Sequence, residues 1–373
     1  MSASGPVASA SVPSAAVPSA AVPSSAVADR AAPPAPAPLA EVWRGDFTES
    51  VHVGHAVVCT PSGEIVEAWG DPARITLPRS AVKMIQALPL LESGAADAFR
   101  LGTERLALAC ASHSGAPMHV ERVRSWLDGL GLGDDALRCG PQPSGWAPER
   151  DRMIRAGEAP GQAHNNCSGK HTGFLTLAAH LRAGPEYVEP DHPVQIAARE
   201  AMAEMTGDAG LGFGVDGCSA PNFAATLQGL AWAMARMARP AEAGLGRART
   251  AAAERLVTAM ATHPELVSGE GRACAGFMRA LADASGGGGG LPAAVKTGAE
   301  GVFCAILPAQ GLGIALKIED GATRASECAM AALLARLGAV EASDPRIAER
   351  LRAGLPNRRG LPVAGMRPAA GLV

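Results

Sequence analysis

Segments with the pattern of β-strands lie at both ends of the chain and enclose a middle with a mostly helical pattern. Near the start, residues 50–58 and 64–70 are rich in apolar residues with strand spacing, and Pro61-Ser62-Gly63 between them is typical of a hairpin turn. Near the other end, short strands are predicted at 294–297, 301–307 and 313–318. Strands drawn from both ends predict an α+β fold with one antiparallel sheet of about five strands, packed against a mainly helical region.

The helical pattern dominates the part of the chain between these strands. Helices are predicted at 117–130, 172–181 and 192–206, then up to about Ala238 and at 249–262, with a closing helix at 326–337. A cleft between the sheet and this helical region is where we expect a substrate to bind.

The two ends of the chain differ in composition from this core. Residues 1–38 are almost all Ala, Pro, Ser and Val, and their regularly spaced prolines exclude a helix, so we predict a disordered tail. The ordered domain is predicted to span 39–340, and residues 341–373 form a C-terminal extension. A glycine run at 285–290 predicts a flexible return to the sheet.

Charge and hydropathy exclude several classes of function. The net charge of −3 gives no basic field for nucleic acid, and no apolar run reaches the roughly 18–20 residues that cross a bilayer. The eight cysteines are scattered through apolar segments without C-x-x-C, and the chain shows no secretory signal. We therefore expect reduced, mostly buried cysteines in a cytoplasmic protein.

Lysine is rare in this chain, whereas arginine is common. Lysine can lose its proton and act as a base or a metal ligand, which arginine cannot do. The few lysines are therefore candidates for chemistry, and three of the four lie in short polar motifs. The four are Lys83, Lys170, Lys296 and Lys317.

The first motif is S-x-x-K, formed by Ser80 and Lys83 near a predicted helix start after Pro78. A spacing of three residues puts both side chains on one face of a helix, roughly 5–6 Å apart at Cβ. A lysine with a lowered pKa can then take the proton of the serine. On its own the motif is also compatible with an ordinary solvated serine and lysine.

Two further motifs carry a lysine and a serine. Lys296-Thr297-Gly298 lies on the first late strand, and serine β-lactamases place such a K-T-G opposite S-x-x-K. Ser112 begins a small-residue loop, S-H-S-G, after an apolar segment, where a hydroxyl can face a cleft. His113 beside it is a candidate base or substrate contact, and Ser112 can instead pair with a lysine. The alternative for Lys296 is an ordinary lysine at a strand edge, and the alternative for Ser112 is an ordinary turn.

A fourth group combines Cys167, Lys170 and Cys218. Two thiolates, a neutral nitrogen and a water would complete a four-coordinate zinc site, although lysine is a rare zinc ligand. Two buried cysteines and a capping lysine are the alternative. Asp216, close to Cys218, can bind a substrate ammonium or form an Asx turn.

At these residues the chain resembles a known family. The motifs S-x-x-K, A-S-H-S-G, N-N-C-S-G-K-H and D-G-C-S-A-P, in this order, resemble the Rhizobium-type (class 3, asparaginase II) L-asparaginases between about Leu39 and Leu337. The resemblance implies a fold similar to serine β-lactamases and class A glutaminases, and hydrolysis of L-asparagine to L-aspartate and ammonia. It also implies a homodimer.

The family's functional residues map onto this chain one by one. Its two serine–lysine pairs match Ser80 with Lys83 and Ser112 with Lys296. Its metal ligands, usually for zinc that supports substrate binding, match Cys167, Lys170 and Cys218.

The resulting hypothesis is that Ser80 attacks the side-chain amide of asparagine. Lys83, or Lys296 through Ser112, takes the proton, while Arg79 and Asp216 hold the α-carboxylate and α-amino groups of the substrate. Two alternatives stay open: a glutaminase or other serine hydrolase of the same fold, and a non-enzymatic zinc-binding or ligand-sensing module.

Overall fold

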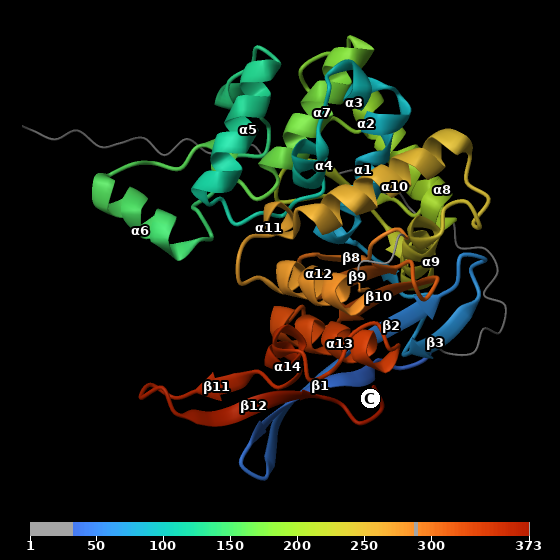
Figure 1. Cartoon of the computed structure of the whole chain (residues 1–373), viewed down its shortest axis with the longest axis vertical. Helices are drawn as coiled ribbons and strands as arrows, with labels where there is room; N and C mark the ends of the chain where they lie inside the picture. The colour runs from blue at the N-terminus through green and yellow to red at the C-terminus, as the bar shows by residue number, and fades with distance from the viewer. Residues whose placement is uncertain (1–32, 287–289, 373) are drawn as a thin grey trace, which may run out of the picture. The chain divides into compact units, whose positions relative to one another are not determined.

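One antiparallel sheet runs through the part of the chain that the structure describes, with helices on either side (Figure 1). The structure is a computed structural model that describes residues 33–286 and 290–372. The eight strands run in the order β11-β12-β1-β2-β10-β9-β8, and β3 pairs with β2. Their bounds are β1 Ala37–Arg44, β2 Phe47–Cys59, β3 Ile65–Trp69, β8 Ala294–Thr297, β9 Val302–Leu307, β10 Leu312–Ile318, β11 Gly354–Pro356 and β12 Pro362–Pro368.

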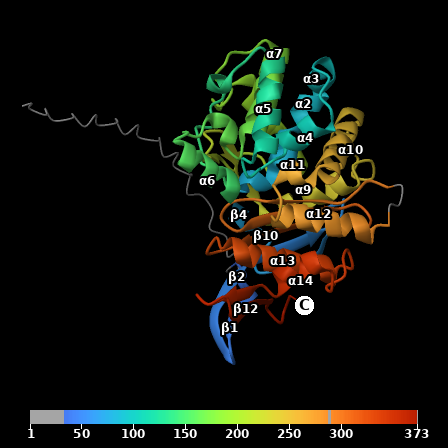
Figure 2. The ribbon, with the colours of Figure 1, turned by 60° about the vertical axis from the view of Figure 1, so that its left-hand side comes forward.

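Helices cover both faces of this sheet (Figures 1 and 2). α9 (Leu227–Ala238) packs on β2, β9 and β10, while α13 (Thr323–Arg336) packs on β1, β9, β10 and β12. Side chains alternate between the two faces of a strand, yet all six residues of β9 are buried. Its sequence, VFCAIL, is accordingly apolar throughout, as a strand covered on both faces requires.

Most of the remaining helices form the region that carries most of the motifs, whereas α12 (Ala273–Ala284) and α14 (Pro345–Leu351) pack against β8, α13 and β12. The remaining helices are α1 Lys83–Gln86, α2 Leu88–Glu92, α3 Ala95–Ala98, α4 Thr103–Ala109, α5 Pro117–Gly129, α6 Ala147–Ala156, α7 Ser168–Leu181, α8 Pro193–Thr206, α10 Arg247–Thr262, α11 Pro264–Val267, α12 and α14. Short 3₁₀ turns are η1 Arg79–Val82, η2 Asp134–Ala136 and η3 Gln162–His164. Two small strand pairs join β4 (Ile75–Thr76) to β7 (Ala225–Thr226) and β5 (Phe213–Val215) to β6 (Pro221–Phe223).

The predicted fold class is confirmed: the chain is α+β, with one antiparallel sheet drawn from both ends of the chain. All five predicted strands are present, as β2, β3, β8, β9 and β10, and Pro61-Ser62-Gly63 turns between β2 and β3. The sheet is larger than expected because β1, β11 and β12 extend it along the first half of β2.

Two local expectations need correction. The helix predicted to carry Ser80 and Lys83 is not continuous: Ser80 lies in η1, and the chain then forms the short α1 and α2. The apolar helix predicted from Thr172 starts four residues earlier, at Ser168, so Lys170 belongs to its first turn.

The predicted tail and glycine run fall largely outside the described residues. Residues 1–32 and 287–289 are not described, so disorder and flexibility there stay predictions. β1 begins at Ala37, two residues before Leu39, where the ordered domain was predicted to start. Residues of the predicted C-terminal extension form α14, β11 and β12, and β12 pairs with β1.

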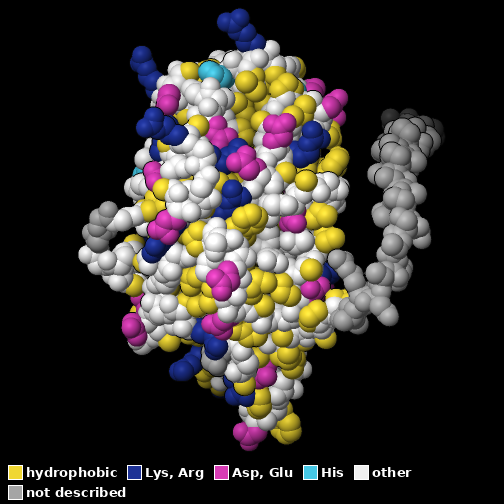
Figure 3. Space-filling view, turned by 90° about the vertical axis from the view of Figure 1, so that its right-hand side faces the viewer, with side chains coloured by type: hydrophobic (Ala, Val, Ile, Leu, Met, Phe, Trp, Pro, Cys, Tyr) yellow, Lys and Arg dark blue, Asp and Glu magenta, His cyan; other side chains and the backbone are white. Residues whose placement is uncertain are grey.

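The structure also bears on the cysteines and on the lack of long apolar runs. All eight cysteines are buried and free of disulfide bonds. In the part of the chain that the structure describes, every helix is too short or too polar to span a membrane. On the face shown in Figure 3, positive and negative side chains are interspersed.

Candidate active site

Two buried lysines from opposite ends of the chain meet at one serine hydroxyl. Lys83 Nζ lies 3.1 Å from Ser112 Oγ, and Lys296 Nζ lies 2.9 Å from the same oxygen. Lys83 opens α1, Ser112 follows α4, and Lys296 lies on β8. The sheet is what brings Lys296 to the other two residues, because its edge strand β8 packs against η1, directly before Lys83.

The two lysines differ in how their remaining N–H groups are used. Lys83 Nζ also contacts the carbonyl oxygen of Ala111 and lies 3.1 Å from Cys167 Sγ, so all three protons of its ammonium group have an acceptor. Lys296 Nζ has one further acceptor, the carbonyl oxygen of Thr297 at 2.7 Å. Every N–H of Lys83 is therefore already directed at an acceptor, whereas Lys296 can hold a lone pair towards Ser112.

Burial gives Lys296 the properties of a base. Its side chain is fully enclosed, and this burial lowers the pKa of Lys296 to about 7. The nearby thiol of Cys274 opposes the shift, and the positive charge of Lys83 adds to it. Near neutral pH a large fraction of Lys296 is then the free amine.

Ser80 lies next to this cluster but is not bonded to it. Its hydroxyl makes no hydrogen bond to any described residue, and Ser80 is half-buried, whereas Ser112 is only 7% exposed. The K-T-G segment packs directly on the Ser80 turn: a Cβ on Gly298 would lie 2.6 Å from the carbonyl oxygen of Pro78 and 3.2 Å from the amide of Ala81. The spacing of Ser80 and Lys83 thus predicted that the two residues lie close together. It did not predict that Lys83 bonds to Ser112 instead of Ser80.

Arg79 and Asp216, expected to hold two different groups of a substrate, form one ion pair. Arg79 donates through Nε at 3.0 Å and Nη2 at 2.8 Å, both to Asp216 Oδ1. Against the opposing effect of burial, Arg79 holds the pKa of Asp216 below its usual value. Asp216 Oδ2 and Arg79 Nη1 have no hydrogen-bond partner among the described residues.

The two cysteines and the lysine of the predicted metal site are neighbours. Lys170 Nζ lies 3.2 Å from Cys218 Sγ. The neighbouring Cys167 thiol lowers the pKa of Cys218 to about 5, and the Lys170 ammonium acts in the same direction. Burial disfavours the charged form of Lys170, but the two cysteine sulfurs outweigh it and raise the pKa of this lysine.

This donor set fits a zinc ion in number and chemistry. Two sulfurs and one amine converge, and thiolates with a nitrogen are the ligands that zinc prefers. Among the described residues no three His, Cys, Asp or Glu side chains gather as a metal site, so the third donor here has to be Lys170. Binding would require Lys170 to release its proton, which makes affinity depend on pH.

His113 has a structural environment rather than a catalytic one. It is 1% exposed, and its Nδ1 accepts the amide proton of Gly115 at 3.1 Å. Its Nε2 therefore carries the proton and donates to Ser168 Oγ at 2.9 Å. Burial lowers the pKa of His113 well below its usual value. With both nitrogens occupied, the ring anchors the Ser112 loop to α7 and is not placed to contact a substrate.

Sequence reasoning did not single out Asn222, which lies on β6 beside the site. Its Oδ1 accepts the backbone N–H of Arg79 at 3.1 Å. A signal was present in the sequence, because asparagine is as scarce as lysine and Asn222 directly follows D-G-C-S-A-P.

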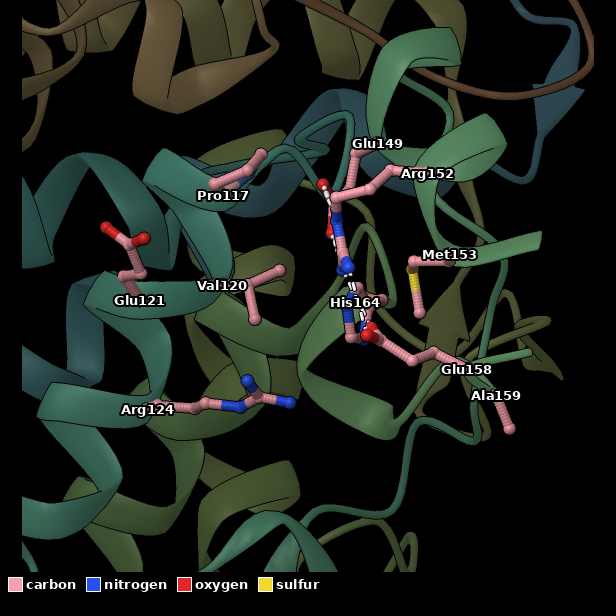
Figure 4. Close-up of a pocket in the computed structure, with 10 residues that line it drawn as sticks. All are labelled: Pro117, Val120, Glu121, Arg124, Glu149, Arg152, Met153, Glu158, Ala159 and His164. Atoms are coloured by element: carbon pink, nitrogen blue, oxygen red, sulfur yellow. Dashed lines mark hydrogen bonds and ion pairs between the residues drawn. The ribbon is translucent and has the colours of Figure 1, made fainter. Parts of the chain in front are cut away.

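A polar cavity lies away from this cluster, between α5, α6 and His164 (Figure 4). Its volume is about 540 Å³, and within it Arg152 bridges the carboxylates of Glu149 and Glu158. None of the predicted site residues lines it, so the candidate site is defined by the serine–lysine cluster and not by this cavity.

Comparison with known proteins adds a family and three weak structural matches. A family model described as L-asparaginase II matches residues 40–368. No curated protein sequence matches the chain significantly. A β-lactamase from Mycobacterium bovis is 16% identical, with a TM-score of 0.39, over 76% of this chain and 94% of that one.

The other two structures are similarly distant. A putative β-lactamase from Bacteroides dorei is 10% identical, with a TM-score of 0.38, over 71% of this chain and 84% of that one. The protein Mglu, in its tris and glutamate form, is 18% identical, with a TM-score of 0.37, over 84% of this chain and 64% of its own. At these TM-scores the three structures carry no argument about activity.

Proposed function

Since the chain belongs to the L-asparaginase II family, we propose that it hydrolyses L-asparagine to L-aspartate and ammonia through a serine–lysine mechanism. The observation that supports this most directly is the meeting of Lys83 and Lys296 at the hydroxyl of Ser112. An amide hydrolase needs a hydroxyl that can lose its proton at neutral pH, and a hydrogen-bond donor on one side with a free amine on the other meets that need.

In this mechanism Ser80 is the nucleophile and Ser112 carries its proton. Ser80 is the more accessible hydroxyl, whereas Ser112 is enclosed and bonded to both lysines. As Ser80 attacks the carboxamide carbon, its proton passes to Ser112 and the proton of Ser112 passes to Lys296. The lysine returns a proton to the departing ammonia, and water then opens the β-aspartyl ester on Ser80.

The ion pair of Arg79 and Asp216 is suited to hold the amino-acid end of the substrate. Arg79 Nη1 would bind the α-carboxylate, and Asp216 Oδ2 would bind the α-ammonium. An adjacent donor and acceptor of opposite charge match a zwitterion without burying a net charge.

Zinc is part of the proposal through Cys167, Lys170 and Cys218, which would hold it. Bound there, zinc would supply a fixed positive charge that supports substrate binding. Lys83 would keep its hydrogen bonds to Ser112 and Ala111, so its ammonium group would still face the relay serine.

The central test measures ammonia release from L-asparagine and traps the covalent intermediate. We expect Ser80→Ala to abolish release and the trapped adduct to map to Ser80 by mass spectrometry of peptides. An adduct found only on Ser112 would reverse the roles of the two serines. Unchanged release in Ser80→Ala would instead favour a sensor, or chemistry elsewhere in the protein.

Substrate range is tested by comparing asparagine, glutamine and a chromogenic β-lactam. Glutamine is one methylene longer, which a pocket discriminates by about 1–3 kcal/mol. A glutaminase or another serine hydrolase would show the higher kcat/KM on its own substrate. A chelator added to the asparagine assay should raise KM if zinc supports substrate binding.

The proposal also includes a cytoplasmic homodimer, as the family resemblance implies. Light scattering after size-exclusion chromatography should give a mass twice that of the 37.7 kDa chain. A mass of one chain at assay concentration would remove the dimer from the proposal.

A further inference from the structure

The turn that carries Ser80 has an unfavourable backbone conformation. Arg79, directly before Ser80, has φ +53°, in the left-handed region that residues with a side chain rarely adopt. Holding such a residue is energetically unfavourable, so neighbouring groups have to stabilise it. A relaxed Arg79 would turn the following residue, Ser80, away from its present direction.

Three contacts hold this turn from different elements. The Arg79 side chain is tied to Asp216, and Gly298 on the strand side packs on Pro78 with no room for a Cβ. The third contact acts on the backbone of Arg79 itself: its N–H donates to Asn222 Oδ1 at 3.1 Å.

Asn222 is well placed to be a rigid acceptor. It is only 3% exposed and lies on β6, where it pairs with Gly214 of β5 in a short antiparallel ladder. Its orientation is fixed by chemistry, because only the oxygen of a side-chain amide can accept the Arg79 proton. The hydrogen bond therefore links the loop that carries Asp216 and Cys218 to the backbone in front of the nucleophile.

We propose that Asn222 is a positioning residue for Ser80: through Oδ1 it holds Arg79 in the left-handed conformation that directs the serine hydroxyl. The inference rests on Ser80 being the nucleophile of the proposed function, and it does not depend on which amide is the substrate. Asn222 acts through Arg79 and does not itself touch the reacting atoms.

The test uses a reaction that needs Ser80 but not the asparagine site. A fluorophosphonate forms a Ser80 O–P bond while the P–F bond breaks, fluoride leaves and the serine proton goes to the lysine base. Intact-mass and peptide spectra give the rate of labelling at Ser80. The probe lacks amino and carboxylate groups, so this rate is independent of substrate contacts with Arg79 and Asp216.

We expect Asn222→Ala to slow labelling, and kcat for asparagine, by about 10- to 100-fold, while KM changes less. Asn222→Asp keeps the acceptor oxygen and should label much faster than Asn222→Ala. The matched control is Asn357→Ala: Asn357 Oδ1 also accepts backbone N–H groups, from Arg359 at 2.9 Å and Leu361 at 3.1 Å, but far along the chain in the β11–β12 loop. It should label at the wild-type rate.

A double variant separates positioning from a general loss of structure. Glycine adopts positive φ without strain. In an Arg79→Gly background the further change Asn222→Ala should therefore slow labelling by less than 3-fold, well below its effect in the wild-type background. If Asn222→Ala does not fold, as judged by thermal unfolding, Asn222→Ser takes its place in both backgrounds.

Three results would overturn the inference: wild-type labelling in Asn222→Ala, an equal loss in the Arg79→Gly background, or a wild-type protein that is not labelled at Ser80. If labelling follows the expected pattern but asparagine is not hydrolysed, only the proposed substrate is refuted. The role of Asn222 would still stand.

Discussion

At the scale of single residues, the site depends on two lysines whose side chains have different surroundings. Lys83 has three acceptors for its protons, whereas Lys296 is fully buried with two. The rarity of lysine in the sequence indicated both residues. It did not indicate that both would contact Ser112 rather than Ser80, because side-chain directions depend on how η1 and β8 pack.

The first prediction concerns pH. Lys296 accepts a proton only as the free amine, and burial lowers its pKa to about 7. Activity should therefore fall as the pH drops below about 7 and level off above it, with a limiting slope of one in a plot of log kcat/KM against pH. Initial rates of ammonia release between pH 5 and 9 measure this. An acid limb centred near the ordinary pKa of lysine would show that the base is not a lysine with a lowered pKa.

The second prediction compares two conservative substitutions. Lys296→Arg keeps a positive charge but cannot give up its proton, so we expect kcat to fall by at least about 10²-fold. Lys317→Arg is the control, since Lys317 donates to the carbonyl oxygens of Glu300 and Ile318, as arginine also can. It should keep more than half of the activity. Equal losses of kcat in the two variants would indicate that the substitutions destabilise the protein and do not act on proton transfer.

At the scale of elements, strands with a clear apolar pattern were predictable and those without one were not. β9 and β10 are apolar runs bounded by turns. β1, β11 and β12 contain prolines and exposed positions, and they become strands because their partners are available. α6 also escaped prediction, since it begins at the end of a segment with loop composition, G-P-Q-P-S-G-W-A-P.

The third prediction tests how β8 supports the Ser80 turn. Gly298→Ala would place a Cβ 2.6 Å from the carbonyl oxygen of Pro78, so β8 and η1 have to move apart. The movement needed to relieve this 2.6 Å contact would shift Ser80, so kcat should fall by about 10-fold or more. Gly184→Ala is the control because nothing lies within 4 Å of its added Cβ. Its kcat should equal that of the wild type, and a wild-type rate in Gly298→Ala would show that this contact is not needed.

At the scale of the whole molecule, the last residues of the chain complete the sheet around β1. β12 pairs with β1, with Met366 opposite Val42, and both side chains are buried in the core. The composition of residues 341–373 gave no sign of this role. Their helix and strands are short and rich in glycine, proline and arginine, and the pairing partner lies at the other end of the sequence.

The fourth prediction follows from that pairing. Met366→Ala should lower the free energy of unfolding by about 2–5 kcal/mol, because it leaves a cavity between β12 and the core. Val363→Ala, on the same strand but 37% exposed, should change it by about 0.5 kcal/mol or less. Chemical denaturation curves measure both. Similar small effects would mean that β12 is dispensable for stability.

A hydrolase whose site needs residues from both halves of the chain should be inactive while it is being synthesised. Ser112 and Lys296 are 184 residues apart, and only the closing strands of the sheet bring them together. A ribosome-bound chain that ends before β8 has emerged contains the serines and Lys83 but has no proton acceptor beside them. If Lys296 is the base, amide cleavage should therefore begin only once synthesis has passed β8.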